Sequence, residues 1–154
     1  FSAIQFEVEG ARALDLFAGS GQLGIEALSR GAARAVFVDC RREALDVVRE
    51  NLTKTRLDGR AQVVRMDYMA YLASCRERFD LIFLDPPYAE IFLENTLNRI
   101  SQIDILSHRG IIICERPLEK QLPERFGALA CTKTYRYGKT AVSLYRWAPG
   151  SETT

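Results

Sequence analysis

Short apolar runs alternate along the chain with segments in which apolar residues recur at helical spacing. The runs predict strands at residues 12–17, 35–38, 61–65, 79–84 and 111–114. Helical spacing predicts helices at residues 1–8, 41–56, 68–75 and 91–103, and another that follows the glycine-rich residues 18–24 and runs to about residue 30. Strands that alternate with helices in this way form a parallel sheet with helices on both faces.

The pattern changes after Pro117, where two further strand-like runs follow at residues 129–137 and 140–147. Gly138-Lys139 between them is a hairpin signal, so these two strands are expected to pair antiparallel. We therefore expect one α/β domain over residues 1–148, in which this hairpin closes a mostly parallel sheet. The small and polar residues 149–154 are expected to form a frayed tail.

Composition adds several exclusions. A length of 154 residues suits one domain with a hydrophobic core, and a formal net charge of +1 does not by itself indicate a nucleic-acid-binding protein. The four cysteines are far apart and there is one histidine, which argues against a metal site and a disulfide scaffold. Without a signal peptide or an apolar run near ~18 residues, we expect a cytoplasmic protein with reduced thiols and no membrane span.

The fourth predicted strand leads directly into Asp85-Pro86-Pro87-Tyr88. Proline has no N–H, so strand pairing must stop here, in a stiff loop at the carboxyl end of the strand. Open α/β sheets bind their ligands at this edge. The Asp85 carboxylate and the Pro86 carbonyl are two fixed acceptors beside the Tyr88 ring, which suits a planar ring that bears an amino group. Considered alone, these residues fit a simple turn with a surface tyrosine equally well.

Gly19, Gly21 and Gly24 lie between the first strand and the next helix, and they match the pattern Gly-x-Gly-x-x-Gly. Glycine lets the backbone turn sharply and lets a ligand approach, and a helix N-terminus attracts an anion. The Lys-Ser/Thr ending of a Walker loop is absent. The pattern alone also fits a tight strand-to-helix turn without a ligand.

Three further acids lie at or near the ends of predicted strands. Asp39 ends the second strand, where an acid can accept both ribose hydroxyls of a nucleoside, and Asp67 follows the third and can accept from an adenine amino group. Either residue could instead cap the helix that follows it. Asp15 lies within the first strand, where a carboxylate is costly unless loop N–H groups or a ligand ammonium satisfy it. Because parallel strands share one carboxyl edge, these acids are expected to line one site.

Residues 15–21, the acids after the second and third strands, and residues 85–88 together resemble class I S-adenosylmethionine-dependent methyltransferases that act on amino groups. Residues 14–32 and the hairpin at 137–138 are similar to the bacterial RsmD family, whose members methylate the N2 amine of a guanine in small-subunit (16S) ribosomal RNA. The resemblance implies a seven-stranded Rossmann-like class I methyltransferase fold. The resemblance further implies a basic N-terminal segment ahead of the position that corresponds to Phe1, and we expect this segment to be missing from the sequence.

The resemblance also implies roles for individual residues. Those implied to bind the cofactor S-adenosylmethionine are Asp15, Phe17, Ala18, Gly19, Gly21, Asp39, Met66 and Asp67. Within this set, Asp15 and the glycines would line the methionine part, Asp39 would hold the ribose, and Asp67 beside Met66 the adenine. The implied catalytic residues are Asp85, Pro86, Pro87 and Tyr88, of which the first two hold the target amine and Tyr88 stacks on the base. The resemblance implies that the protein is a monomer and that its partner is 16S ribosomal RNA or a small-subunit particle.

Other functions fit part of the same pattern. A nicotinamide-dependent oxidoreductase would use the glycines and Asp39 but leaves the diproline loop unexplained, and a nucleic-acid-binding module could keep the fold without the activity. Among amino-methyltransferases, DNA adenine or cytosine and protein glutamine are alternative targets. The candidate RNA contacts are Arg116, Lys120, Arg136 and Lys139. Taken one at a time, each of these four residues is better explained as a solvated surface position.

Overall fold

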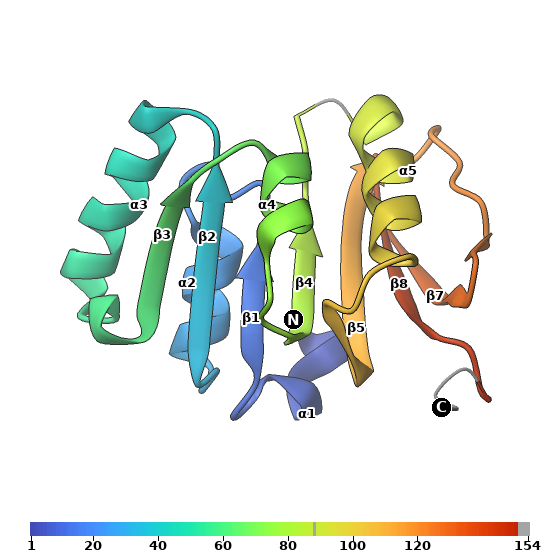
Figure 1. Ribbon diagram of the computed structural model, residues 1–154, viewed down its shortest axis with the longest axis horizontal. Coiled ribbons are helices and arrows are strands. Elements are labelled where there is room, and N and C mark those ends of the chain that lie inside the picture. Colours follow the sequence, from blue (N-terminus) through green and yellow to red (C-terminus); the bar gives the residue numbers. More distant parts are fainter. Residues whose placement is uncertain (88, 151–154) are drawn as a thin grey trace.

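Pairing between the apolar runs produces one sheet in the computed structural model, which describes residues 1–87 and 89–150. Its strands are β1 (Arg12–Asp15), β2 (Arg34–Asp39), β3 (Ala61–Arg65), β4 (Phe79–Leu84), β5 (Leu106–Pro117), β6 (Arg125–Phe126), β7 (Leu129–Tyr137) and β8 (Thr140–Trp147). Their order across the sheet is β3-β2-β1-β4-β5-β8-β7-β6 (Figure 1). The first five strands run parallel and the last three pair antiparallel, which confirms the predicted sheet with its closing hairpin.

Two strands differ in detail from the expectation. The two-residue strand β6 adds to the seven expected strands and pairs with β7 at the edge of the sheet. A strand of this length is too short to produce a periodic pattern in the sequence. Strand β5 is longer than predicted because Leu106 pairs with β4 at one end and Pro117 pairs with β8 at the other. The end of the predicted frayed tail, residues 151–154, lies outside the described residues.

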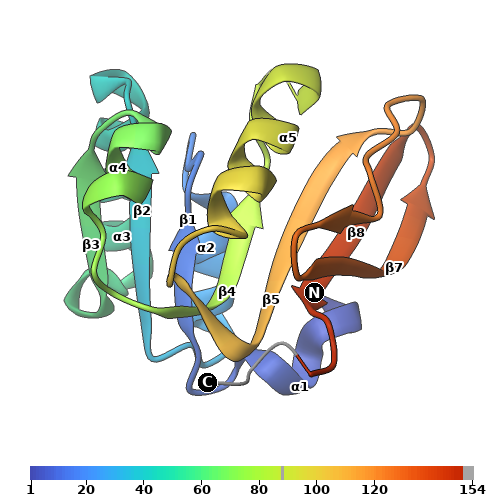
Figure 2. The same cartoon turned by 45° about the vertical axis from the view of Figure 1, so that its right-hand side comes forward.

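Helices cover both faces of the sheet. They are the 3-10 helices η1 (Ser2–Ile4) and η2 (Asp58–Arg60) and the α-helices α1 (Gln5–Val8), α2 (Gln22–Ser29), α3 (Arg42–Thr55), α4 (Tyr68–Ser74) and α5 (Ala89–Ile100). Figures 1 and 2 show α1, α2 and α3 on one face and α4 and α5 on the other. Because successive strand residues point to opposite faces, Leu14 and Ile82 join the core under α4 and α5, whereas Ala13 and Leu81 join the other core. None of the described helices is both long and apolar enough to cross a membrane.

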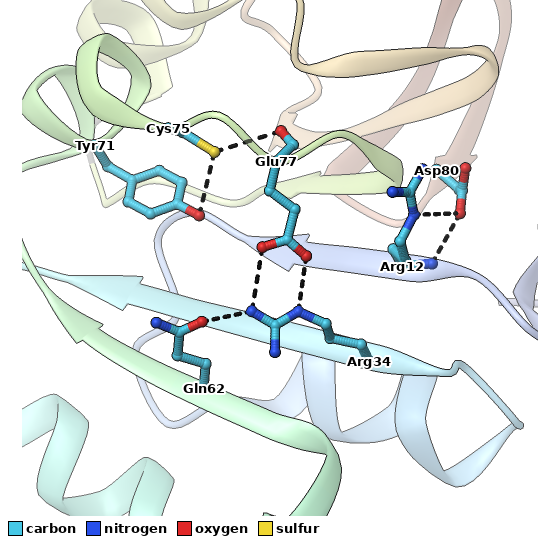
Figure 3. Close-up of polar contacts among 7 residues, drawn as sticks. All are labelled: Arg12, Arg34, Gln62, Tyr71, Cys75, Glu77 and Asp80. Carbon is cyan, nitrogen blue, oxygen red and sulfur yellow. Dashed lines mark hydrogen bonds and ion pairs between the residues drawn. The ribbon is translucent and has the colours of Figure 1, made fainter.

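Polar side chains connect the N-terminal ends of β1 to β4 (Figure 3). Arg34 of β2 donates from Nε and Nη2 to the two carboxylate oxygens of Glu77, at 2.7 and 3.1 Å, and also donates to Gln62 of β3. The backbone N–H of Arg12 in β1 donates to the carboxylate of Asp80 in β4 at 2.9 Å. These contacts stabilise the alignment of four strands from the end opposite to their carboxyl edge.

Helix α2 approaches β2 closely at Gly24. A Cβ atom on this residue would lie only 2.8 Å from Cζ of Phe37, a side chain with 0% of its surface exposed. Glycine in a helix costs about 1 kcal/mol relative to alanine. Its presence in α2 is therefore explained by the short distance between helix and sheet, which in turn brings the first turn of α2 to the end of β1.

We expect Gly24→Ala to lower the free energy of unfolding by about 1–3 kcal/mol, because overpacking against Phe37 outweighs the gain in helix propensity. Denaturant titration followed by circular dichroism measures the change. Gly59→Ala is the matched control, since a Cβ there meets no atom within 4 Å, and it should change stability by at most about 0.5 kcal/mol. A Gly24→Ala variant as stable as the wild type would show that the close approach is not needed.

Candidate active site

The carboxyl ends of the parallel strands surround a cavity of about 820 Å³. The predicted site residues that line it are Asp15, Phe17, Ala18, Gly19, Asp39, Met66, Asp67, Asp85, Pro86 and Pro87. Gly21 lies one residue beyond Ser20, which also lines the cavity. Tyr88, the predicted stacking residue, lies outside the described residues. The structure thus brings together residues from the ends of four different strands, in a volume typical of small-molecule sites.

The glycine loop is held from within the protein. Gly19 and Gly21 have φ values of 57° and 84°, a left-handed backbone conformation that residues with a side chain rarely adopt. The Gly19 N–H donates to Oδ2 of Asp39 at 3.0 Å and the Gly21 N–H to the carbonyl of Ala18 at 2.7 Å. Among the described residues, no acceptor is bound to the N–H groups of Gln22 and Leu23, which open helix α2 beside the cavity. These two donors are available to an anionic group.

Asp15 is the most deeply buried acid of the site, with 1% of its surface exposed. Its Oδ2 accepts a hydrogen bond from the Gly24 N–H at 3.0 Å, so the helix supplies the N–H that a buried carboxylate here was expected to need. The net effect of its surroundings raises the pKa of Asp15 to about 7. Burial is the largest cause, the Gly24 N–H acts to lower the pKa, and the negative charges of Asp85 and Asp39 act to raise it. Asp15 is therefore able to change its charge near neutral pH.

Asp39 is also buried, but its surroundings act in the opposite direction. Burial would raise its pKa, whereas the Arg41 side chain and the N–H groups of Arg41 and Gly19 lower it, and the net result is a pKa below the usual value. Its Oδ1 accepts from the Arg41 N–H at 2.9 Å and from Nε at 3.2 Å. Helix α3 follows without a side-chain cap from Asp39. Asp39 thus remains an anion that connects the glycine loop to the end of β2.

Asp67 does cap a helix, as the structural alternative predicted. Its Oδ2 accepts from the N–H groups of Met69 and Ala70 at 3.0 and 3.4 Å, in the first turn of α4. Within the described residues, no hydrogen bond uses Oδ1. Because Asp67 also lines the cavity, the cap and a ligand contact do not exclude each other.

The diproline loop begins where the sequence predicted. Strand β4 ends at Leu84, after which Asp85 is exposed, Pro86 is buried and Pro87 is exposed. Although Asp85 is at the rim, partial removal of its carboxylate from water raises its pKa. Asp85 and Pro86 both line the cavity that the glycine loop also lines.

The cavity contains residues that the sequence analysis missed. Phe17 forms an aromatic cluster with Tyr68 and Phe92, whose ring centroids lie 5.1 and 5.9 Å from that of Phe17. Phe92 comes from α5, and only the tertiary structure brings it to this edge. Glu115 of β5 also lines the cavity. A signal for Glu115 was present, since it directly follows the apolar run at 111–114, just as Asp39 follows an earlier run.

The four predicted RNA contacts fall into two pairs. Arg116 is engaged within the protein, where Nε donates to the Lys120 carbonyl at 2.8 Å and Nη1 to the Ser143 hydroxyl at 2.9 Å. Lys120 itself forms an ion pair with Glu94 at 3.4 Å. Arg136 on β7 and Lys139 in the hairpin turn are exposed. A role of Arg136 and Lys139 in RNA binding stays a prediction, and the internal contacts of the other pair argue for a structural role.

Comparison with known proteins relates this arrangement to enzymes. The protein is 43% identical over 149 residues to the putative rRNA methyltransferase YlbH of Bacillus subtilis. The aligned region covers 95% of this chain and 81% of the relative. It is 34% identical over 136 residues to ribosomal RNA small subunit methyltransferase D of Escherichia coli, covering 88% and 68% of the two chains. The solved structure of the putative methyltransferase yhhF from Escherichia coli has a TM-score of 0.88 and 32% identity, with 96% and 83% covered.

A family model described as "Conserved hypothetical protein 95" matches residues 1–146, almost the whole chain. The solved relative has the same fold over nearly the entire length, which confirms the class I methyltransferase fold predicted from the sequence. The chain therefore belongs to the Conserved hypothetical protein 95 family, the RsmD family of class I methyltransferases.

Proposed function

We propose that this protein transfers a methyl group from S-adenosylmethionine to the exocyclic N2 amine of a guanine in small-subunit (16S) ribosomal RNA. One observation carries the proposal: the glycine loop and the diproline loop line the same cavity. A methyl donor and an amine acceptor must be adjacent for transfer, and one cavity with both loops can hold them together. The names of the two relatives from Bacillus subtilis and Escherichia coli support ribosomal RNA as the substrate.

The residues of the cavity fit the cofactor. The free N–H groups at the start of α2 suit the carboxylate of its methionine part, and the buried Asp15 suits the ammonium group beside that carboxylate. Asp39 would accept from the ribose hydroxyls, and Oδ1 of Asp67, next to Met66, would accept from the adenine amine. When bound, S-adenosylmethionine supplies a methyl group that its sulfonium has already activated.

The diproline loop would hold the acceptor. The lone pair of the guanine N2 amine is delocalised into the ring, which makes the nitrogen a poor nucleophile. The Asp85 carboxylate and the Pro86 carbonyl would accept hydrogen bonds from the two N–H groups of this amine. Electron density then stays on the nitrogen, and the positive charge that develops there is stabilised. The raised pKa of Asp85 suits this carboxylate to take the proton that the methylated amine releases. The base must first leave its stack, at a cost of roughly a few kcal/mol.

Mass spectrometry of nucleosides tests this function directly. Small-subunit particles from a strain that lacks the gene would be incubated with the purified protein and S-adenosylmethionine that carries a deuterated methyl group. We expect label in N2-methylguanosine of the small-subunit RNA. Label in adenosine, in DNA or in protein glutamine would assign a different acceptor, and no transfer with saturable binding of NAD would indicate an oxidoreductase.

We expect Asp85→Ala to lower the rate of methyl transfer about 100-fold or more, because one of the two acceptors for the amine is lost. Calorimetry should show cofactor affinity close to that of the wild type, since Asp85 belongs to the acceptor side of the cavity. Asp58→Ala is the matched control, because that carboxylate is exposed on η2 and outside the cavity. A folded Asp85→Ala variant that no longer binds the cofactor would contradict the assigned role.

We expect the affinity for S-adenosylmethionine to fall as the pH is lowered below about 7. The pKa of Asp15 is about 7 in the free protein, and the cofactor ammonium requires the ionised carboxylate, so protonation of Asp15 competes with binding. Calorimetry at pH 6 in buffers of different ionisation enthalpy should therefore detect release of about one proton per cofactor bound. In Asp15→Asn the affinity should be lower, and this proton release should be absent. The lower limit of pH 5.5 is about one and a half pH units below that pKa. A wild-type affinity that stays constant between pH 7 and pH 5.5 would refute the pairing of Asp15 with the cofactor ammonium.

A further inference from the structure

Glu115 is the acid of the cavity to which neither the sequence nor the proposed mechanism assigns a role. In the parallel pairing of β4 and β5, Phe83 is opposite Ile113 and Leu84 is opposite Cys114. One residue further along each chain, Asp85 and Glu115 are therefore neighbours at the carboxyl edge. Because side chains alternate along a strand, Asp85 and Glu115 follow on from Phe83 and Ile113 on the same side of the sheet. Glu115 is thus placed beside the residue that would hold the target amine.

The surroundings of Glu115 provide no partner for its carboxylate within residues 1–87 and 89–150. Among the described residues, no hydrogen bond or ion pair involves its side chain. The next residue, Arg116, is engaged with Ser143 and the Lys120 carbonyl instead. Partial burial raises the pKa of Glu115, and the negative charge of Asp85 raises it further. A half-buried acid in a cavity without a partner of its own is well suited to accept hydrogen bonds from a ligand.

We propose that Glu115 accepts the N1–H of the target guanine and thereby restricts methylation to guanine. This role rests on the proposed function and names the group that selects the base. Asp85 and Pro86 would contact only the exocyclic amine, which adenine and cytosine also possess, so they cannot distinguish the three bases. A second acceptor beside the amine can.

The ring atom next to the amine differs among the three bases. In guanine the N2 amine is adjacent to N1–H, a donor, which can bind a carboxylate. In adenine the N6 amine is adjacent to N1, and in cytosine the N4 amine is adjacent to N3, and both ring nitrogens are acceptors. An ionised Glu115 would place its oxygen against the lone pair of such a nitrogen, which is repulsive. Glu115 would therefore attract guanine and reject adenine and cytosine at the same time.

The purine analogue 2-aminopurine tests this contact, because it keeps the 2-amino group but has an unprotonated N1. Small-subunit particles would be assembled on RNA that carries either guanine or 2-aminopurine at the methylated position. For the wild type we expect kcat/KM to be about 10- to 100-fold lower with 2-aminopurine, the range of one well-formed base contact. The Glu115→Gln side chain can turn its NH₂ toward the unprotonated N1. This variant should bring the ratio of the two kcat/KM values to within about threefold of unity.

Glu119→Gln is the matched control. It removes the same charge a few residues further along the chain, from an exposed residue that does not line the cavity, and it should keep the wild-type ratio. Cofactor affinity, measured by calorimetry, should be equal in all three proteins.

Two results would overturn the role of Glu115 while the proposed function stands. In one, Glu115→Gln lowers kcat/KM equally for both bases. In the other, it weakens cofactor binding and leaves the base ratio unchanged, which would make Glu115 a charge partner of the cofactor. If the wild type methylates no guanine N2 in these particles, the proposed function itself fails, and the role of Glu115 fails with it.

Discussion

The parallel alignment of the first five strands is the constraint on which the candidate site depends. In each of these strands, apolar residues lead to a charged residue at or near the carboxyl end, and pairing places all of these ends on one side of the sheet. Asp15, Asp39, Asp85 and Glu115 meet there although they are separated by up to a hundred residues in sequence. The polar contacts of Arg12 and Arg34 stabilise the same alignment from the opposite ends of the strands.

The acids that meet at this edge do not share one electrostatic environment. Arg41 and the glycine loop lower the pKa of Asp39, whereas burial raises the pKa values of Asp15, Asp85 and Glu115. Together with Asp67, these acids make five carboxylates in one cavity, which favours a ligand that brings positive charge and N–H donors. A sulfonium cofactor with an ammonium group, together with the amino edge of a guanine, has these properties. The electrostatics therefore support the proposed pair of substrates beyond the presence of motif residues.

Several residues of the site serve the fold and the cavity together. Asp67 caps α4 and lines the cavity, and Asp39 holds the glycine loop while it remains an anion. Gly24 allows α2 to pack against Phe37, and its N–H binds Asp15. For these positions, the structural and functional interpretations that the sequence left open are compatible, because a side chain or N–H group fixed by local structure is also pre-oriented for a ligand.

The sequence by itself determined the alternating strands and helices, the closing hairpin and the strand-end positions of most site residues, because periodicity, glycine and proline act locally. Only the tertiary structure decided which strand ends are neighbours and how each acid titrates, since both depend on residues distant in the chain. Phe92 joins the cavity through the packing of α5, and β6 forms because β7 offers it an edge. Glu115 becomes interpretable for the same reason: its position after an apolar run is visible in the sequence, but its place beside Asp85 follows from the pairing of β4 with β5.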